Sequence, residues 1–207
     1  MKVLVFGAHP DDAEIGMGGT IARYTRLGHQ VMIVVSIIPN NKEIRLKESE
    51  KAAKILDAEL KILDIDPNKF KVDRINLKLF DDIIKDYSPD IAYTCWYGDS
   101  HQDHNVTTRL VIAASRKNKY SLYMYEHMIP GGLTPYCFKA QSFVDISDII
   151  GKKIEAIKAH ASQLTSYGDD LLDYIIGKAT YRGYQISTKY AEVFEIIKEI
   201  KSINPNK

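Results

Sequence analysis

The segment of the sequence richest in reactive side chains directly follows an apolar run at residues 3–6. One imidazole and three carboxylates fall within six residues there: His9, Asp11, Asp12 and Glu14. Carboxylates this close together raise each other's pKa unless a cation neutralises them. A divalent metal ion would do so, and zinc accepts mixed nitrogen and oxygen ligands. We therefore predict that His9 and Asp12 bind a metal, while Asp11 stays free to act as a general base.

A second polar cluster, residues 101–104, follows the apolar run that ends at residue 95. If His104 completes the metal site, three protein ligands leave a position open, as in catalytic rather than structural zinc sites. His101 could then stabilise an oxyanion or protonate a leaving amine, with Asp103 orienting its ring. The alternative is a polar loop in which Asp103 caps the next helix and the histidines lie on the surface.

The residues after the first cluster allow two interpretations each. Glu14 either caps the following helix or supports the metal site from behind. The glycine-rich run at residues 16–20 could cradle a phosphate at a helix N-terminus. It lacks the GxGxxG order and the Walker lysine, so we expect these glycines to pack a helix closely onto the sheet.

Short apolar runs alternate with longer amphipathic segments along the whole chain. We expect strands at residues 3–6, 31–35, 60–63, 90–95, 122–125 and 138–144. We expect helices at residues 16–27, 43–56, 77–87, 106–117, 149–160 and 190–200. This alternation predicts one α/β domain over residues 1–207, with a Rossmann-like, mainly parallel sheet covered by helices on both faces. Ligands of such sheets bind at the carboxyl ends of the strands, where both polar clusters fall.

Three finer expectations concern single segments. In the helix at 43–56, the expected core positions are Ile44, Ala52, Ile55 and Leu56. The segment 167–184 has weak periodicity and several glycines, which favours a mobile loop over a site. The tail at 202–207 is expected to fray.

Composition excludes several classes of protein. The formal net charge of the 207 residues is +1, so no broad field attracts nucleic acid or an anionic membrane. No apolar run reaches the roughly 18 residues of a membrane span, and no signal peptide is visible. Cys95 and Cys137 lack metal-type spacing and are expected to be reduced thiols in a cytoplasmic protein. The sequence does not decide whether the protein forms a homo-oligomer.

Together, these motifs resemble the LmbE-like, or PIG-L-type, N-acetylglucosaminyl deacetylase family. The family's AHPDD motif, followed by an acid and a GG pair, is matched by residues 8–20, and its HxDH motif by residues 101–104. Residues 153–163 fit its K-x-x-A-x-x-x-H-x-S-Q helix, and residues 190–194 contain its AExF segment. The GMGGT run is most similar to the bacillithiol-type bacterial branch. Gln102 departs from the pattern, since many members have proline there.

The resemblance implies specific roles for the two clusters. Zinc, or another divalent metal, would be held by His9, Asp12 and His104. Asp11 would be the general base, and His101, assisted by Asp103, would stabilise the oxyanion or act as the acid. These roles agree with those inferred above from the residue types.

The resemblance also points to residues outside the clusters. Arg45 falls where the family often has an arginine that faces the substrate. Tyr125, with Glu126 and His127, could line the pocket, although a strand of the aromatic core explains the same residues. His160 either supports the metal site or is a helix histidine satisfied by packing.

The expected reaction is hydrolysis of the N-acetyl group of an N-acetylglucosamine-type sugar or sugar conjugate, releasing acetate and a free amine. One rival is a metal-dependent phosphoesterase, which would bind two ions tightly. Another is a non-enzymatic module that binds a sugar or a nucleotide, in which ligand binding survives chelation. The sequence does not identify the sugar conjugate.

Overall fold

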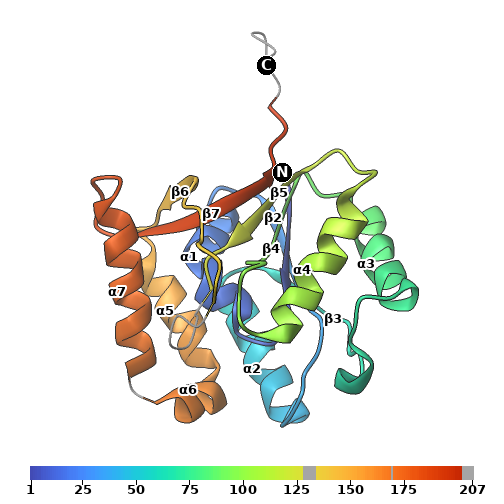
Figure 1. Ribbon diagram of the computed structural model, residues 1–207. Helices are drawn as coiled ribbons and strands as arrows, with labels where there is room; N and C mark the ends of the chain where they lie inside the picture. The colour runs from blue at the N-terminus through green and yellow to red at the C-terminus, as the bar shows by residue number, and fades with distance from the viewer. Residues whose placement is uncertain (128–133, 169, 202–207) are drawn as a thin grey trace.

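The computed structural model describes residues 1–127, 134–168 and 170–201. Within these residues a sheet of seven strands has the order β3-β2-β1-β4-β5-β7-β6 (Figure 1). The strands are β1 (Lys2–Gly7), β2 (Gln30–Val35), β3 (Glu59–Ile62), β4 (Ile91–Cys95), β5 (Ser121–Tyr125), β6 (Ser142–Asp145) and β7 (Ala191–Lys198). β1 to β5 are parallel, whereas β7 runs antiparallel to β5 and β6. The predicted α/β fold with a mainly parallel sheet is confirmed.

Helices cover both faces of the sheet (Figure 1). One face packs against α1 (Asp12–Arg26), α2 (Lys42–Ile55) and α5 (Ile150–Ala159), and the other against α3 (Arg74–Tyr87) and α4 (Gln102–Ser115). A short 3₁₀ turn, η1 (Pro67–Lys69), precedes α3, while α6 (Ala161–Tyr167) and α7 (Asp170–Tyr184) follow α5. Each face of the sheet has its own hydrophobic core, and alternate residues of β1 pack into the two. Val3 and Val5 lie in one core, and Leu4 and Phe6 lie in the other.

The predicted helix at residues 190–200 is wrong, because this segment is β7. Its second residue, Glu192, is buried and forms an ion pair with the Nζ of Lys153. The same carboxylate accepts the backbone N–H groups of Gly19 and Thr20. The charge of Glu192, which in the sequence suggests an exposed helix position, is therefore neutralised inside the protein. Pairing with β5 and β6 then holds this segment as a strand.

The predicted mobile loop at residues 167–184 is also wrong, because most of it is the helix α7. Leu171, Ile175 and Ala179 recur at helical spacing and are all buried. Leu171 and Ile175 pack with Ile15 and Ile157 in a small apolar cluster, so α7 is anchored beside α1 and α5.

Other boundaries differ in detail. α1 begins at Asp12, four residues before the predicted start, and its backbone is irregular at Met17. β6 begins only at Ser142, so the expected strand at 138–144 is too early. Ala52 and Leu56 are buried as expected and Ile55 is partly buried, but Ile44 is 54% exposed. The tail at 202–207 lies outside the described residues.

The glycines of α1 do pack closely, as expected. A Cβ atom on Gly16 would lie 2.2 Å from the ring of Tyr125, and one on Gly19 would lie 2.8 Å from Ile146. Only glycine lets the helix approach β5 at this distance. Across the described part of the chain, none of the helices is long and apolar enough to cross a membrane.

Candidate active site

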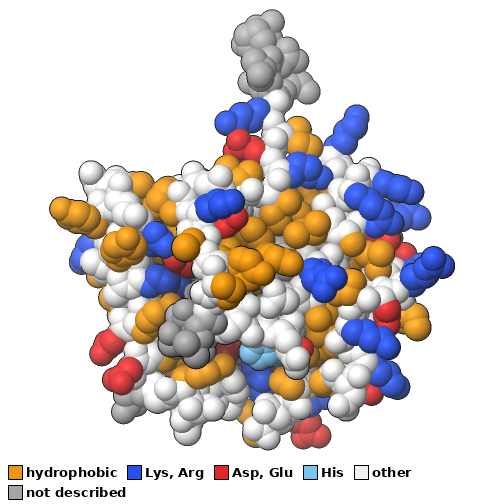
Figure 2. All heavy atoms as spheres, in the orientation of Figure 1, with side chains coloured by type: hydrophobic (Ala, Val, Ile, Leu, Met, Phe, Trp, Pro, Cys, Tyr) orange, Lys and Arg blue, Asp and Glu red, His pale blue; other side chains and the backbone are white. Residues whose placement is uncertain are grey.

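Both polar clusters lie at the carboxyl edge of the sheet, where they line one pocket with a cavity volume of about 420 Å³. Histidine side chains reach the surface on the face that Figure 2 shows, below a group of hydrophobic side chains. The inner wall carries the acidic and histidine residues, and the rim carries Asn40, Ser100, Gln163, Ser166 and Tyr167. The pocket is thus charged at its base and mostly neutral at its mouth.

Asp11 lies in a tight turn between β1 and α1. Its φ is +93°, a left-handed conformation that is uncommon for residues other than glycine, asparagine and aspartate. Arg45 Nη2 donates to the Pro10 carbonyl at 3.0 Å and lies 3.7 Å from Asp11 Oδ1. Burial, with the neighbouring Asp12 carboxylate, raises the pKa of Asp11 to about 8. Asp11 Oδ2 is buried without a hydrogen-bond partner, so this carboxylate favours a proton or a nearby cation.

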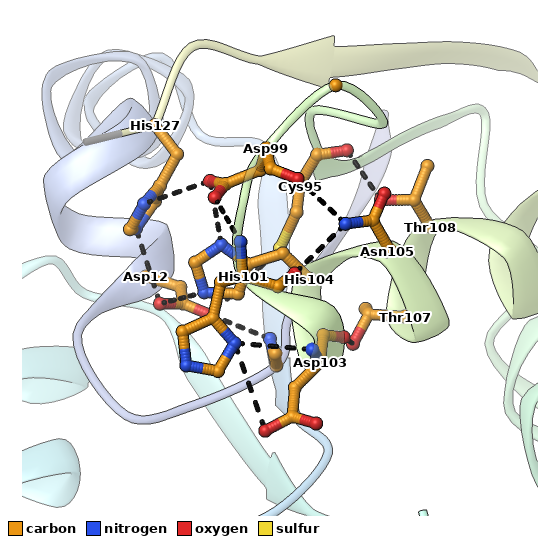
Figure 3. A network of polar contacts seen from close by, with 12 residues as sticks. Asp12, Cys95, Asp99, His101, Asp103, His104, Asn105, Thr107, Thr108 and His127 are labelled. Carbon is orange, nitrogen blue, oxygen red and sulfur yellow. Dashed lines mark hydrogen bonds and ion pairs between the residues drawn. The ribbon is translucent and has the colours of Figure 1, made fainter. Parts of the chain in front are cut away.

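Asp12 holds its two oxygens in different environments. Oδ2 accepts the backbone N–H groups of Ala8 at 2.8 Å and of His9 at 2.9 Å. Oδ1 lies 3.3 Å from Nε2 of His104 (Figure 3). Burial alone would raise the pKa of Asp12, but His104 and His127 hold it well below its usual range. Asp12 is therefore an ionised carboxylate whose orientation the backbone fixes and whose Oδ1 could bind a cation.

The loop after β4 positions the second cluster. Asp99 Oδ1 accepts the backbone N–H of His101 at 2.8 Å, and Asp99 Oδ2 lies 2.8 Å from Nδ1 of His104. This contact turns Nε2 of His104 toward Asp12 (Figure 3). Burial opposes a charge on His104, but Asp12 is the main cause that holds its pKa well above the usual value.

His101 occupies the N-cap of α4, where its Nδ1 accepts the backbone N–H of Asp103 at 3.2 Å. Its side chain is half exposed and faces the pocket. Burial, together with His104 and His9, lowers its pKa, so His101 is a neutral imidazole near pH 7. The expectation that Asp103 orients His101 needs correction. Asp103 Oδ2 lies 3.1 Å from Nε2 of His9 but 3.9 Å from Nδ1 of His101.

The structure brings the predicted metal ligands His9, Asp12 and His104 side by side. His9 Nδ1 lies 3.8 Å from Asp12 Oδ2, and the rings of His9 and His104 are 5.4 Å apart. Among the described residues, two groups offer three ligand atoms within 4.8 Å of one another. They are His9, His101 and His104, and Asp12, His104 and His127. Imidazoles with one carboxylate are a donor set that suits zinc and similar divalent ions.

Tyr125 and His160, both expected near the site, are buried away from the pocket surface. Tyr125 is fully buried, and its hydroxyl donates to the Phe6 carbonyl at 2.9 Å. It is not among the residues that line the pocket, so a substrate contact by Tyr125 does not fit this structure. His160 is also buried, and its Nε2 lies 3.4 Å from Oε1 of Glu14. His160 also lies near enough to Asp11 for its charge to favour the ionised form of that carboxyl.

Comparisons with known proteins agree with this geometry. The model of the PIG-L family, described as GlcNAc-PI de-N-acetylase, matches residues 4–115, which include both polar clusters. The chain belongs to the PIG-L family. It is 29% identical over 217 residues to the diacetylchitobiose deacetylase of Thermococcus kodakarensis, covering 92% of this chain and 81% of the relative. The resemblance to the bacillithiol-type branch stays a prediction.

Solved structures of other proteins superpose on this fold over almost its whole length. The N,N'-diacetylchitobiose deacetylase of Pyrococcus horikoshii, solved with an inhibitor, is 26% identical with a TM-score of 0.80. That match covers 99% of this chain and 87% of the other. GalB, a 4-carboxy-2-hydroxymuconate hydratase from Pseudomonas putida KT2440, has a TM-score of 0.84 at 22% identity, covering 98% of both chains. Because a hydratase shares the fold, the reaction must be inferred from the site.

One buried side chain of the site, Asp99, is absent from the predicted set, and His127 was expected to line the pocket but not to contact Asp12. Asp99 orients His104, and its only signal in the sequence is its place two residues before His101. His127 lies 3.2 Å from Asp12 through its Nε2. Its place after Tyr125 and Glu126 suggests that it could line the pocket, as it does, but no motif points to its contact with Asp12. Its approach to Asp12 depends on β5 lying beside β4, with α1 packed over the sheet.

Proposed function

We propose that this PIG-L family member is a divalent-metal-dependent deacetylase. Its substrate would be an N-acetylglucosamine-type sugar or sugar conjugate, and its products acetate and a free amine. The observation that carries the proposal is the buried Asp11 carboxylate, held in a tight turn beside the Asp12–His104 pair at the base of a pocket. Binding alone does not require a buried carboxylate with a raised pKa next to a metal site, whereas a general base that works near neutral pH benefits from one.

His9, Asp12 and His104 would hold the ion. When bound, zinc would polarise the acetyl carbonyl and lower the pKa of water toward about 7. Asp11 then removes a proton from the attacking water as the oxygen bonds to the acetyl carbon. The C–N bond breaks, and the proton passes to the departing amine, so that acetate and the amine leave.

His101 would stabilise the negative charge that develops on the acetyl oxygen. It is half exposed at the pocket wall, it is neutral, and its Nδ1 accepts the Asp103 N–H. The remaining nitrogen, Nε2, therefore carries the proton and can donate a hydrogen bond.

The rim of the pocket supports a sugar as the substrate. Asn40, Ser100, Gln163 and Ser166 offer neutral hydrogen-bonding groups, and Tyr167 adds an aromatic ring. Neutral donors and acceptors around an aromatic surface suit the hydroxyls and the apolar face of a pyranose. The two diacetylchitobiose deacetylases found by comparison act on an N-acetylated sugar, which agrees with this inference.

We infer a small amino-sugar conjugate as the partner and the cytoplasm as the location. Cys95 and Cys137 are free thiols, which agrees with a reducing compartment.

The test is acetate release from a panel of N-acetylglucosamine conjugates by the zinc-loaded protein. We expect release from at least one conjugate, and a loss of about 10²–10⁴-fold in Asp11→Asn, which keeps the side-chain shape but cannot accept the proton. Asparagine also tolerates the left-handed conformation, so the turn should persist. Phosphate esters tested in parallel address the phosphoesterase rival. Turnover of these esters with two tightly bound ions, without acetate release, would overturn the proposal.

A further inference from the structure

The buried imidazole of His127 directly faces the proposed metal site. Its Nε2 lies 3.2 Å from Oδ1 of Asp12, and its ring meets the ring of His104 edge-on at a centroid distance of 4.6 Å. Figure 3 shows Asp12 between these two histidines. His127 is 5% exposed and lines the same pocket.

Asp12 leaves one oxygen for both histidines. Because Oδ2 is occupied by the backbone N–H groups of Ala8 and His9, Oδ1 faces Nε2 of His104 and Nε2 of His127. One carboxylate oxygen and two imidazole nitrogens thus converge on a single point, and all three residues are buried. A metal ion satisfies such a set, since a carboxylate and two imidazoles in their neutral form can each direct a lone pair at the same point.

The chain segment that carries His127 is held firmly. The carbonyl of the preceding residue, Glu126, accepts from Lys178 Nζ at 2.9 Å, and its carboxylate pairs with Arg182, both on α7. The Glu126 N–H donates to the Val193 carbonyl of β7 at 3.4 Å. This support fixes the backbone at the end of β5, as metal ligands need.

Asp99 lies on the Nδ1 side of His127, within ion-pair distance but beyond that of a hydrogen bond. Its Oδ2 lies 3.8 Å from Nδ1 of His127 and 2.8 Å from Nδ1 of His104. One carboxylate therefore faces the Nδ1 side of both rings, which directs both Nε2 atoms toward Asp12. A carboxylate behind the ring is the usual way in which a histidine is oriented toward a metal.

From this convergence, we propose that His127 is a ligand of the same ion that Asp12 and His104 hold, adding to the predicted ligand His9, so that water or substrate would enter as a fifth ligand. The inference rests on the proposed function, which supplies the ion. It assigns His127 a direct metal contact, whereas the alternative is a hydrogen bond from its ring to Asp12.

The test compares zinc binding by the full chain in wild type and in His127→Gln and His127→Ala. Glutamine can still donate a hydrogen bond to Asp12 but is a poor zinc ligand. His29→Gln is the matched control, because His29 lies beside the N-terminus at the opposite edge of the sheet. Zinc affinity is measured by competition with a chromophoric chelator, and the imidazole ligands are counted by X-ray absorption at the zinc edge.

We expect one imidazole fewer around zinc in both His127 variants, and a zinc affinity lowered by about 10–100-fold or more. His29→Gln should match wild type. A wild-type spectrum with no more imidazoles than His9 and His104 supply would overturn the inference, even if the variants fail to fold. So would a His127→Gln spectrum identical to wild type, or two ions per wild-type chain. If wild type bound no zinc at all, the proposed function would fail together with this inference. If wild type bound one zinc without an imidazole from His127, only this inference would fail.

Discussion

Arg45 Nη2 donates to the Pro10 carbonyl at 3.0 Å, and this bond ties the start of α2 to the turn that carries Asp11, the proposed base. The side chain lies in the pocket wall but is 4% exposed. Its guanidinium therefore contacts the protein more than the cavity. A role in holding Asp11 fits this geometry better than the predicted contact with substrate.

Replacing Arg45 with methionine should release the Asp11 turn. We expect kcat to fall by about 10²-fold with little change in KM, because the base is misplaced while the rim is intact. Added guanidinium should restore part of the activity. Arg109→Met, an exposed change on α4, serves as the control. A large rise in KM with unchanged kcat would instead support direct substrate binding.

Asp103→Asn should weaken zinc binding rather than remove an acid. Its carboxylate lies beside Nε2 of His9, so the substitution should lower zinc affinity by about 10–100-fold. His101→Asn should lower kcat while zinc affinity stays near wild type, because His101 faces the pocket. Chelator competition and steady-state kinetics separate the two effects. Equal zinc affinity in Asp103→Asn and wild type would contradict the contact with His9.

Zinc binding should release protons. In the metal-free protein burial opposes a charged His104, but Asp12 holds the pKa of this histidine well above its usual value, so it is protonated near pH 7. Burial holds the pKa of Asp11 at about 8. A metal ion needs a neutral imidazole and disfavours a protonated neighbour, so zinc affinity should fall as the pH falls. Calorimetry in buffers of different ionisation enthalpy should detect about one proton or more. Binding without proton release would contradict these protonation states.

Gly16→Ala should destabilise the fold. The added methyl would lie 2.2 Å from the buried ring of Tyr125, and we expect a loss of about 1–3 kcal/mol in the free energy of unfolding. Gly177→Ala is the control, because a Cβ on this glycine of α7 meets no atom within 4 Å. It should raise stability by about 0.5–1 kcal/mol. Urea unfolding measures both, and an unchanged midpoint for Gly16→Ala would show that α1 can move away from β5.

Much of the site was predictable because its chemistry is local in the sequence. Asp11 and Asp12 are adjacent, and His101 and His104 are three residues apart at the start of α4, so residue type and spacing indicate the roles proposed for them. Their position follows from strand alternation, which places both segments at one edge of the sheet. The contact of Asp103 with His9 was not predictable, since it depends on how the two loops meet.

The remaining errors come from tertiary contacts that override local pattern. Glu192 and Glu195 suggest a helix, but Glu192 pairs with Lys153 inside the protein, and β7 forms between β5 and β6. Gly177 and Gly183 obscure α7, whose buried positions become clear only against Ile15. His127 was expected to line the pocket, but its contact with Asp12 depends on strand order, which single-sequence patterns do not determine.

The central claim is that one divalent ion beside Asp11 drives hydrolysis of an N-acetyl sugar. The most direct measurement is acetate release by chelator-stripped protein during titration with zinc, using the conjugate from the panel that is turned over best. We predict no release without metal, a linear rise with added zinc, and a break near one equivalent per chain. Full acetate release by the stripped protein, or a rise that continues to two equivalents, would contradict the account.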